Sequence, residues 1–518
     1  MRVRASGRSR QSDAWRLAAL CAPLGLLVAS PALAQQQTVR LAPFVRLTET
    51  ITDNAGLRND REAKSDWITQ LSPGVSLEAR GARLNGSLSM SLNANHYGNG
   101  TSSDSTFLTL NGTGKLMAWE NRLYVDLTGS VSRMASSVFD SRPADSVTGT
   151  NQTQVSVFNI SPYFTTRFGS TGSVRLRYMM GISDSGSAAM SRNNTQTWSF
   201  DASDPRMTGF LGWGFSFMDR SSDSSATSRQ LKQQTTRLTG MAQAMPDLML
   251  RLIVGAESNN YRVSNQNSSI YGFGADWTPT PRTRVSGTIE DRFFGTGYTL
   301  AADHRSSQMA YRISYGKDAS STSSSMLSAM TLYDLLMLRA DIVAAYPDVA
   351  AREVAVRQLI ASNQSLTAQQ NQILGAQSVL TDTTFLDERL QVGATYSGPR
   401  NSLSLMAFMS DRESLVDRDY AVGSDIRVGS TLRTTGMIAS LGHQLTPLTS
   451  LNASFSTSRS RNEGSVNQSS QSKMLMAGLS TKLAPKATGM LSARRNQGTG
   501  SVGDYTENAV FGNVVLQF

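Results

Sequence analysis

The stretch Tyr505-Thr-Glu-Asn-Ala-Val-Phe-Gly-Asn-Val-Val-Leu-Gln-Phe518 decides the fold. Every second residue counted back from the end is apolar or small: Phe518, Leu516, Val514, Gly512 and Val510. A period of two indicates a β-strand with one apolar face. An edge strand of a soluble domain has the same pattern, but a strand ending on an aromatic residue is typical of the closing strand of an outer-membrane barrel, whose final aromatic lies at the membrane interface. Phe518 is therefore the expected barrel-assembly signal.

The N-terminal segment predicts secretion. Five arginines up to Arg16 precede the apolar run from Leu17 to Val28, and Ala32-Leu33-Ala34 forms a small-x-small cleavage site. The run is too short to span a membrane, so residues 1–34 are expected to be a signal peptide cleaved after Ala34. Leu20 precedes Cys21, where a lipoprotein site needs a small residue. Since Cys21 is the only cysteine, the mature chain is expected to contain neither disulfides nor thiolate metal ligands.

Composition favours a membrane barrel over a soluble globule. Hydrophobic residues make up 39% of the chain and aromatic residues 7%, a small supply of core for 518 residues. In a membrane barrel only half of each strand faces lipid, and the other half faces water. Removing the signal lowers the net charge from +10 to about +6, with no dense basic block. Nucleic-acid binding is therefore not expected.

Alternating segments recur along the chain, and the connections between them alternate in length. Leu84–Asn93, Leu123–Val131, Val174–Met180 and Met309–Tyr315 show the alternation most clearly. Short connections are expected at residues 81–82, 120–121, 169–172, 204–205, 246–247, 279–281, 306–307, 398–400, 446–447 and 484–485, with longer polar loops between them. Short turns at one end and long loops at the other are typical of outer-membrane barrels.

These turns predict a transmembrane antiparallel up-and-down β-barrel of about 22 strands, within a range of roughly 20 to 24. The barrel spans residues 35–518, with both termini expected in the periplasm. The terminal strand is expected to pair with the first strand near Val39–Thr52. Aromatic residues expected to face lipid are Trp213, Phe215, Phe217, Tyr271, Phe273 and Trp277. Candidate pore-lining residues, expected to point inward, are Arg175, Arg177, Arg251, Arg284, Glu290, Arg292 and Arg312. Such arginines either attract anionic polymers or brace the lumen through ion pairs with carboxylates.

Residues 326–377 break the alternation and have helical periodicity. One helix is expected over Ser328–Ala345 and a second over Asp348–Ser362, with Pro347 suited to a helix start. Strand parity predicts that this helical insertion lies in one extracellular loop, between the fifteenth and sixteenth strands. It is expected to cap the pore, fold into it or dock a partner, and a hairpin packed on itself over the rim is the simplest of these arrangements.

No catalytic, metal or cofactor site is expected. The three histidines, His96, His304 and His443, are far apart in sequence, so a zinc site is not expected. Asp303 and His304 lie near Ser306 and Ser307, but a catalytic triad needs its three groups to converge in space. Serines near a histidine follow here from composition alone.

Several segments together resemble one family. They are residues 48–54, 65–67, 71–75, 160–163, Glu290-Asp-Arg-Phe-Phe-Gly295, 304–305, 333–334, Tyr346-Pro-Asp348 and 398–401. In this order they are similar to the barrel family associated with PEP-CTERM/exosortase and exopolysaccharide gene clusters of Gram-negative bacteria. The resemblance covers nearly the whole mature chain. It implies an outer-membrane barrel that acts in exopolysaccharide production or export, and it supplies no catalytic residues.

The sequence thus predicts a passive hydrated conduit in the outer membrane of a Gram-negative bacterium, acting in exopolysaccharide export. A general diffusion porin and a non-conducting barrel that anchors a surface-assembly complex remain alternatives. A ligand-gated uptake receptor is less favoured, because no plug domain of suitable length precedes the first strand. The expected partners are outer-membrane lipid, lipopolysaccharide, the barrel-assembly machinery and exopolysaccharide export proteins.

Overall fold

The computed structural model describes residues 38–140, 142, 151–185, 192–225, 230–262, 265–321, 330, 332–362, 380–381, 384–417, 425–464, 467–500 and 503–518. The predicted signal peptide, its cleavage site after Ala34 and Cys21 lie outside these residues. So do the two ends of the predicted helical insertion, residues 326–329 and 363–377.

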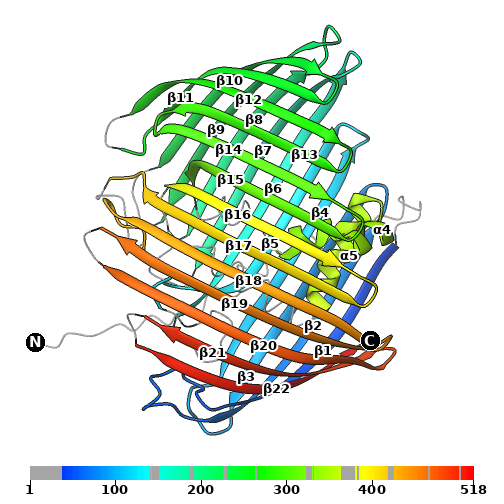
Figure 1. The fold of residues 1–518 in the computed structure, drawn as a ribbon, viewed down its shortest axis with the longest axis vertical. Coiled ribbons are helices and arrows are strands. Elements are labelled where there is room, and N and C mark those ends of the chain that lie inside the picture. Colours follow the sequence, from blue (N-terminus) through cyan, green and yellow to red (C-terminus); the bar gives the residue numbers. More distant parts are fainter. Residues whose placement is uncertain are drawn as a thin grey trace, which may run out of the picture.

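The described residues form a closed antiparallel barrel of 22 strands, which confirms the predicted fold class (Figure 1). The first eleven strands are β1 Thr38–Thr52, β2 Asp66–Arg80, β3 Leu84–Tyr97, β4 Ser105–Trp119, β5 Leu123–Ala135, β6 Gln152–Phe168, β7 Gly172–Ser185, β8 Asn193–Asp204, β9 Leu211–Ser224, β10 Leu231–Met245 and β11 Leu248–Asn259. The others are β12 Gln266–Thr280, β13 Thr283–Arg292, β14 Gly295–Arg305, β15 Met309–Ser320, β16 Phe385–Ser397, β17 Asn401–Ser414, β18 Thr431–Thr446, β19 Thr449–Glu463, β20 Gln468–Ala484, β21 Ala487–Thr499 and β22 Tyr505–Gln517.

The terminal strand closes the barrel as predicted. β22 pairs with β1 in a register that sets Gln517 opposite Phe44 and Ala509 opposite Thr52. The backbone N–H of Phe518 donates to the carbonyl oxygen of Pro43 at 2.9 Å, and the Phe518 ring is exposed. The first and last strands therefore pair over Phe44–Thr52 of β1, which closes the sheet into a barrel.

The connections sort by length between the two ends of the barrel. All ten predicted short turns join the strands between which they were expected, and they form what we call the turn end. The N-terminal end of β1 and the C-terminal end of β22 also lie at this end. Asn121 has φ 54° and Gly169 has φ 60°, left-handed conformations that these two residue types tolerate in tight turns. The opposite end, which we call the loop end, carries most of the long connections, and the turn between β13 and β14 is its short exception.

The outer wall carries a continuous apolar belt. Large exposed side chains alternate with shielded ones along the strands, as with Leu252 on β11, which is 66% exposed, beside Ile253 at 5%. Exposed aromatic residues flank the belt, with Trp67 and Tyr271 toward the loop end and Trp119, Trp277 and Phe518 at the turn end. Such a belt between aromatic girdles is suited to a lipid bilayer. Of the six aromatics predicted to face lipid, Tyr271, Phe273 and Trp277 are strongly exposed, and Phe215 lies on the outer face opposite the exposed Leu238.

Among the described residues, three short helices follow β15: α3 Leu332–Leu338, α4 Ala340–Ala345 and α5 Val349–Ser362. The position between the fifteenth and sixteenth strands and the second helix agree with the sequence prediction. The predicted first helix is instead broken at Arg339, whose ψ of 129° is not helical. None of the helices in the described part of the chain is long and apolar enough to span a membrane.

Candidate functional site: the lumen

The seven candidate pore-lining residues all lie on the inward face of the wall. On β11 and β13 they alternate with the exposed outer residues Leu252 and Ile289, and on β15 Arg312 lies between the exposed Tyr311 and Ile313. On β7, Arg175 and Arg177 flank the exposed Leu176. Alternation in the sequence was enough to predict that these side chains face inward, because successive side chains of a strand point to opposite faces.

Most of these arginines form ion pairs with carboxylates on nearby strands. Arg177 lies 3.2 Å from Asp126, Arg251 lies 3.0 Å from Asp276, and Arg312 lies 2.6 Å from Asp303. These pairs join β7 to β5, β11 to β12, and β15 to β14. Each pair is partly exposed, so it contributes about 1 kcal/mol or less to stability. The pairs leave an inner wall of alternating positive and negative charge, which agrees with the bracing role that the sequence left open.

Arg175 and Arg284 differ from the other arginines. Both are exposed to the lumen, and neither forms an ion pair with a carboxylate among the described residues. Arg175 and Arg177 lie near the ring of Tyr163, at 5.7 and 4.3 Å from its centroid. Arg284 is the register partner of Asp303. Arg175 and Arg284 are therefore the two predicted lumen arginines best placed to meet a passing anion.

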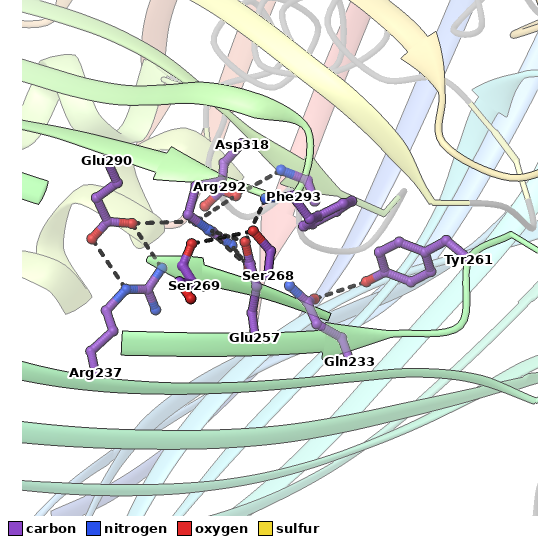
Figure 2. Close-up of polar contacts among 11 residues, drawn as sticks. Gln233, Arg237, Glu257, Tyr261, Ser268, Ser269, Glu290, Arg292, Phe293 and Asp318 are labelled. Carbon is purple, nitrogen blue, oxygen red and sulfur yellow. Dashed lines mark hydrogen bonds and ion pairs between the residues drawn. The ribbon is translucent and has the colours of Figure 1, made fainter. Parts of the chain in front are cut away.

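A buried charge network lies on the inner wall near the loop end. Figure 2 shows Arg292 between Glu257, Glu290 and Asp318, with Arg237 on the other side of Glu290. Arg292 donates from Nε and Nη2 to the Glu257 carboxylate at 2.7 to 3.0 Å, and the Glu257 side chain is only 1% exposed. Arg237 donates to both oxygens of Glu290 at 3.0 and 3.1 Å. The network ties β10, β11, β13 and β15 together.

The tight turn after β13 is held by the same carboxylate. Glu257 also accepts the backbone N–H of Phe293 at 2.7 Å, and Gly295 has φ 97°, which a residue with a Cβ rarely adopts. Sequence reasoning selected Glu290 and Arg292 but missed Glu257 and Asp318. Glu257 was within reach of the same reasoning, because it lies on β11 six residues beyond Arg251 and so on the same face.

The three helices, which we call the lumen helices, pack inside the barrel. Leu336, Ile342 and Val356 form a buried cluster with Met406, Phe408 and Ile438. Met406 and Phe408 alternate with the exposed outer residue Met409 on β17, so they face inward. α3 and α4 also contact β16, whereas α5 reaches β3. The helices therefore fold into the pore rather than packing over the rim, and they lie toward the end that carries the C-terminus in Figure 1.

One side of the inner wall, against which the lumen helices pack, is buried, and another side is accessible. Inward-facing polar side chains are buried along β16 and β17, among them Gln391, Thr395, Ser410 and Arg412, the last with 0% exposure. On the other side, the inward-facing Arg175, Asp201 and Arg284 of β7, β8 and β13 are exposed. The accessible part of the lumen is thus the charged wall of β7 to β14.

A second contact crosses the lumen at the loop end. Asp425, in the connection between β17 and β18, accepts the Val138 backbone N–H at 2.7 Å and the Ser137 hydroxyl at 2.9 Å, both from the connection after β5. Phe139 packs into a buried cluster with Phe385, Ile426 and Leu432. Leu380, just before β16, reaches back to Met134 and Val155 on β5 and β6. We call these contacts the loop crossing, since they join walls on opposite sides of the ring.

The candidate catalytic residues do not converge. Asp303 faces inward to Arg312, whereas His304 contacts Thr283 at 2.9 Å and the outward-facing ring of Tyr311. His96 and His443 bind Asp104 and Asn401, at different ends of the barrel. No group of three or more histidine, cysteine, aspartate or glutamate side chains suited to a metal ion occurs among the described residues.

A closed antiparallel barrel with an apolar outer belt and a polar, charged lumen is the architecture of an outer-membrane β-barrel protein. No protein-family model matches the chain, and no curated protein matches it. Solved structures that resemble it include the FrpB iron transporter from Neisseria meningitidis, with 10% identity, 92% of this chain and 82% of that chain covered, and a TM-score of 0.48. The siderophore receptor PirA from Pseudomonas aeruginosa has 10% identity, coverages of 93% and 81%, and a TM-score of 0.42. A loop-deletion mutant of OmpT from Vibrio cholerae has 7% identity, coverages of 93% and 100%, and a TM-score of 0.31.

Proposed function

We propose that this protein is a gated outer-membrane conduit for a polar polymer, with an exopolysaccharide as its cargo. The observation that carries the proposal is the uneven coverage of the lumen. Inward-facing side chains of β16 and β17, on the wall that the lumen helices contact, are buried. Arg175, Asp201 and Arg284 on the other side of the lumen are exposed. Movement of the helices would widen a passage whose wall is already polar and charged.

Hydroxyl-rich polymers fit such a wall. Mixed charges and hydroxyl groups donate and accept hydrogen bonds without a strong net field, so a polysaccharide can form and break contacts as it passes. The choice of an exopolysaccharide rests on the family resemblance described above. In this proposal the short turns and both termini face the periplasm, as in other outer-membrane barrels. The lumen helices then lie near the periplasmic mouth, where an export partner could displace them.

A non-conducting anchor is the second candidate, and the filled lumen favours it over an open diffusion porin. Both the lumen helices and the loop crossing occupy space that a porin leaves to water. Under the anchor hypothesis these elements are permanent filling. Under the conduit hypothesis they move.

Surface polysaccharide tests the export role. A strain lacking the gene should lose polymer outside the cell and regain it with the wild-type gene. Complementation with Arg175→Glu/Arg284→Glu should restore less polymer at an equal amount of inserted barrel, because the accessible wall has changed charge. Arg58→Glu/Arg61→Glu, which reverses two exposed charges on the β1–β2 loop, is the matched control. Unchanged external polymer in the strain lacking the gene would contradict the export role.

A further inference from the structure

A basic patch lies on the outer wall just beyond the apolar belt. On β20, Lys473 follows the outward-facing Leu475 and Leu479 toward the loop end. Arg459 and Arg461 extend the same face of β19 beyond Phe455, and Arg495 on β21 is level with Leu475 in the register. We define the outer basic patch as Arg433, Arg459, Arg461, Lys473 and Arg495, all of which are exposed.

Strand register brings these positive charges close together. Arg461 is the direct partner of Arg433. Lys473 pairs with Thr457 on one side and Gln497 on the other, which makes it a diagonal neighbour of both Arg459 and Arg495. Diagonal neighbours in an antiparallel sheet lie about 7–8 Å apart. Like charges at this spacing repel each other, so the patch favours a bound anion.

Carboxylates compensate only one edge of the patch. Arg433 lies 2.7 Å from Asp411 and 3.6 Å from Glu463. Arg495 donates to the side-chain oxygen of Asn508 at 3.4 Å, a neutral partner. No ion pair with a carboxylate is formed by Arg459, Arg461, Lys473 or Arg495 within the described part of the chain. Four positive charges therefore face the membrane boundary without an ion-pair partner among the described residues.

The position indicates which anion binds. The patch adjoins exposed apolar side chains, Leu475, Phe455 and Val510, so its ligand carries acyl chains next to its anionic group. Guanidinium groups prefer phosphate because they can bind it through two parallel hydrogen bonds. On the far side of the barrel, the outward positions Gln196, Asp219, Gln234 and Ser258 near the loop end are not basic, and Lys232 is a single basic residue on that face of β10. The site is therefore local, not a ring around the barrel.

We propose that the outer basic patch binds the phosphate groups of a phosphorylated glycolipid, the lipopolysaccharide of the outer leaflet. This inference uses the orientation given under the proposed function, in which the loop end faces outward. It does not depend on conduction, so a failure of glycolipid binding and a failure of conductance are distinguishable. Fixing glycolipid beside β18 to β21 would hold lipid against the wall that adjoins the barrel closure.

Binding to the folded barrel in detergent tests the proposal. The variant Arg459→Gln/Lys473→Gln/Arg495→Gln removes three charges from the patch. The control Arg58→Gln/Arg61→Gln/Lys64→Gln removes three exposed charges from the β1–β2 loop at the same end of the barrel. Heat-modifiable migration checks that each variant is folded. The probes are purified lipopolysaccharide, the same material with its lipid phosphates removed, and phosphatidylglycerol vesicles.

The patch variant should bind lipopolysaccharide about tenfold more weakly or worse than wild type, and the control should bind it as wild type does. Removing the phosphates should weaken wild-type binding to a similar extent. Equal binding by the patch variant, or equal binding of the dephosphorylated glycolipid, overturns the proposal. Equal competition by phosphatidylglycerol vesicles overturns the assignment to a glycolipid. If the triple variant does not fold, Lys473→Gln alone should still weaken binding, and unchanged binding would contradict the site.

Discussion

The backbone N–H of Val138 donates to the Asp425 carboxylate at 2.7 Å, although the two residues belong to connections on opposite sides of the barrel. Val138 follows β5 and Asp425 precedes β18. Burial raises the pKa of Asp425, and the hydrogen bonds from Val138 and Ser137 partly oppose this rise. The contact therefore places an aspartate in a shielded position across the mouth of the lumen. Within the described part of the chain, the lumen helices also reach across the lumen, from β16 to β3.

Replacing Asp425 by alanine should loosen the loop crossing. The substitution removes two acceptors for hydrogen bonds to a charged group, each worth about 1.5–3 kcal/mol. We expect more frequent current fluctuations in planar bilayers than for wild type. Glu62→Ala, which removes an exposed carboxylate from the β1–β2 loop, is the matched control and should have no effect. Identical traces for Asp425→Ala and wild type would show that the crossing does not limit access.

Leu336→Ala should weaken docking of the lumen helices. Leu336 is 1% exposed within the cluster of Met406 and Phe408, and Leu→Ala at such sites costs about 2–5 kcal/mol. Because about 1.4 kcal/mol is a factor of ten, the helices should leave the wall tens of times more often, or more. Protease cleavage within residues 326–377 measures this release. The control is Val349→Ala on α5, which is exposed and should leave the cleavage rate unchanged.

Glu257→Gln should destabilise the barrel far more than a similar change in an exposed ion pair. Glu257 is the buried partner of Arg292, and removing one member of a buried pair costs about 3–5 kcal/mol. Asp303→Asn breaks the partly exposed pair with Arg312 and should cost about 1 kcal/mol or less. Guanidinium unfolding followed by tryptophan fluorescence measures both. Equal losses in the two variants would contradict the structural role assigned to the Figure 2 network.

Deleting Phe518 should reduce the amount of barrel inserted, with little change per inserted molecule. Its ring lies at the turn end on the outer face, away from the lumen, and only its backbone N–H bonds to Pro43. The measurement pairs heat-modifiable migration, which counts folded barrels, with the conductance or polymer export per folded barrel. A normal amount of folded barrel after the deletion would argue against an assembly role.

The wall of the barrel could be predicted from the sequence because each strand carries its own signal. Val510, Val514 and Leu516 alternate with shielded residues, and turn residues such as Asn121 and Gly169 mark the strand ends. The strand count, the closure and the position of the helical insertion in the chain, between β15 and β16, followed from these local patterns. Its expected place in an extracellular loop did not, because the helices fold back into the lumen. The inward orientation of Arg251, Glu290 and Arg292 followed from their place in the two-residue alternation alone.

The contents of the lumen could not be predicted in the same way. Leu336 meets Met406, and Val138 meets Asp425, across large separations in sequence, and no local period encodes those contacts. The helical periodicity of residues 332–362 showed that apolar faces needed a partner but not which partner. The break at Arg339 was also missed, because arginine is an ordinary helix former and no glycine or proline marks the position.

Single-channel recording of a barrel that lacks residues 326–377 tests the central claim most directly. Ser320 and Phe385 are register partners of β15 and β16, so the residues that remain can close the hairpin without straining the wall. We predict that the wild-type barrel is closed most of the time and that the deletion variant has large, long-lived openings, with the Arg175→Glu/Arg284→Glu version shifting its ion preference toward cations. A folded deletion variant that stays as non-conducting as wild type would contradict a conduit gated by the lumen helices.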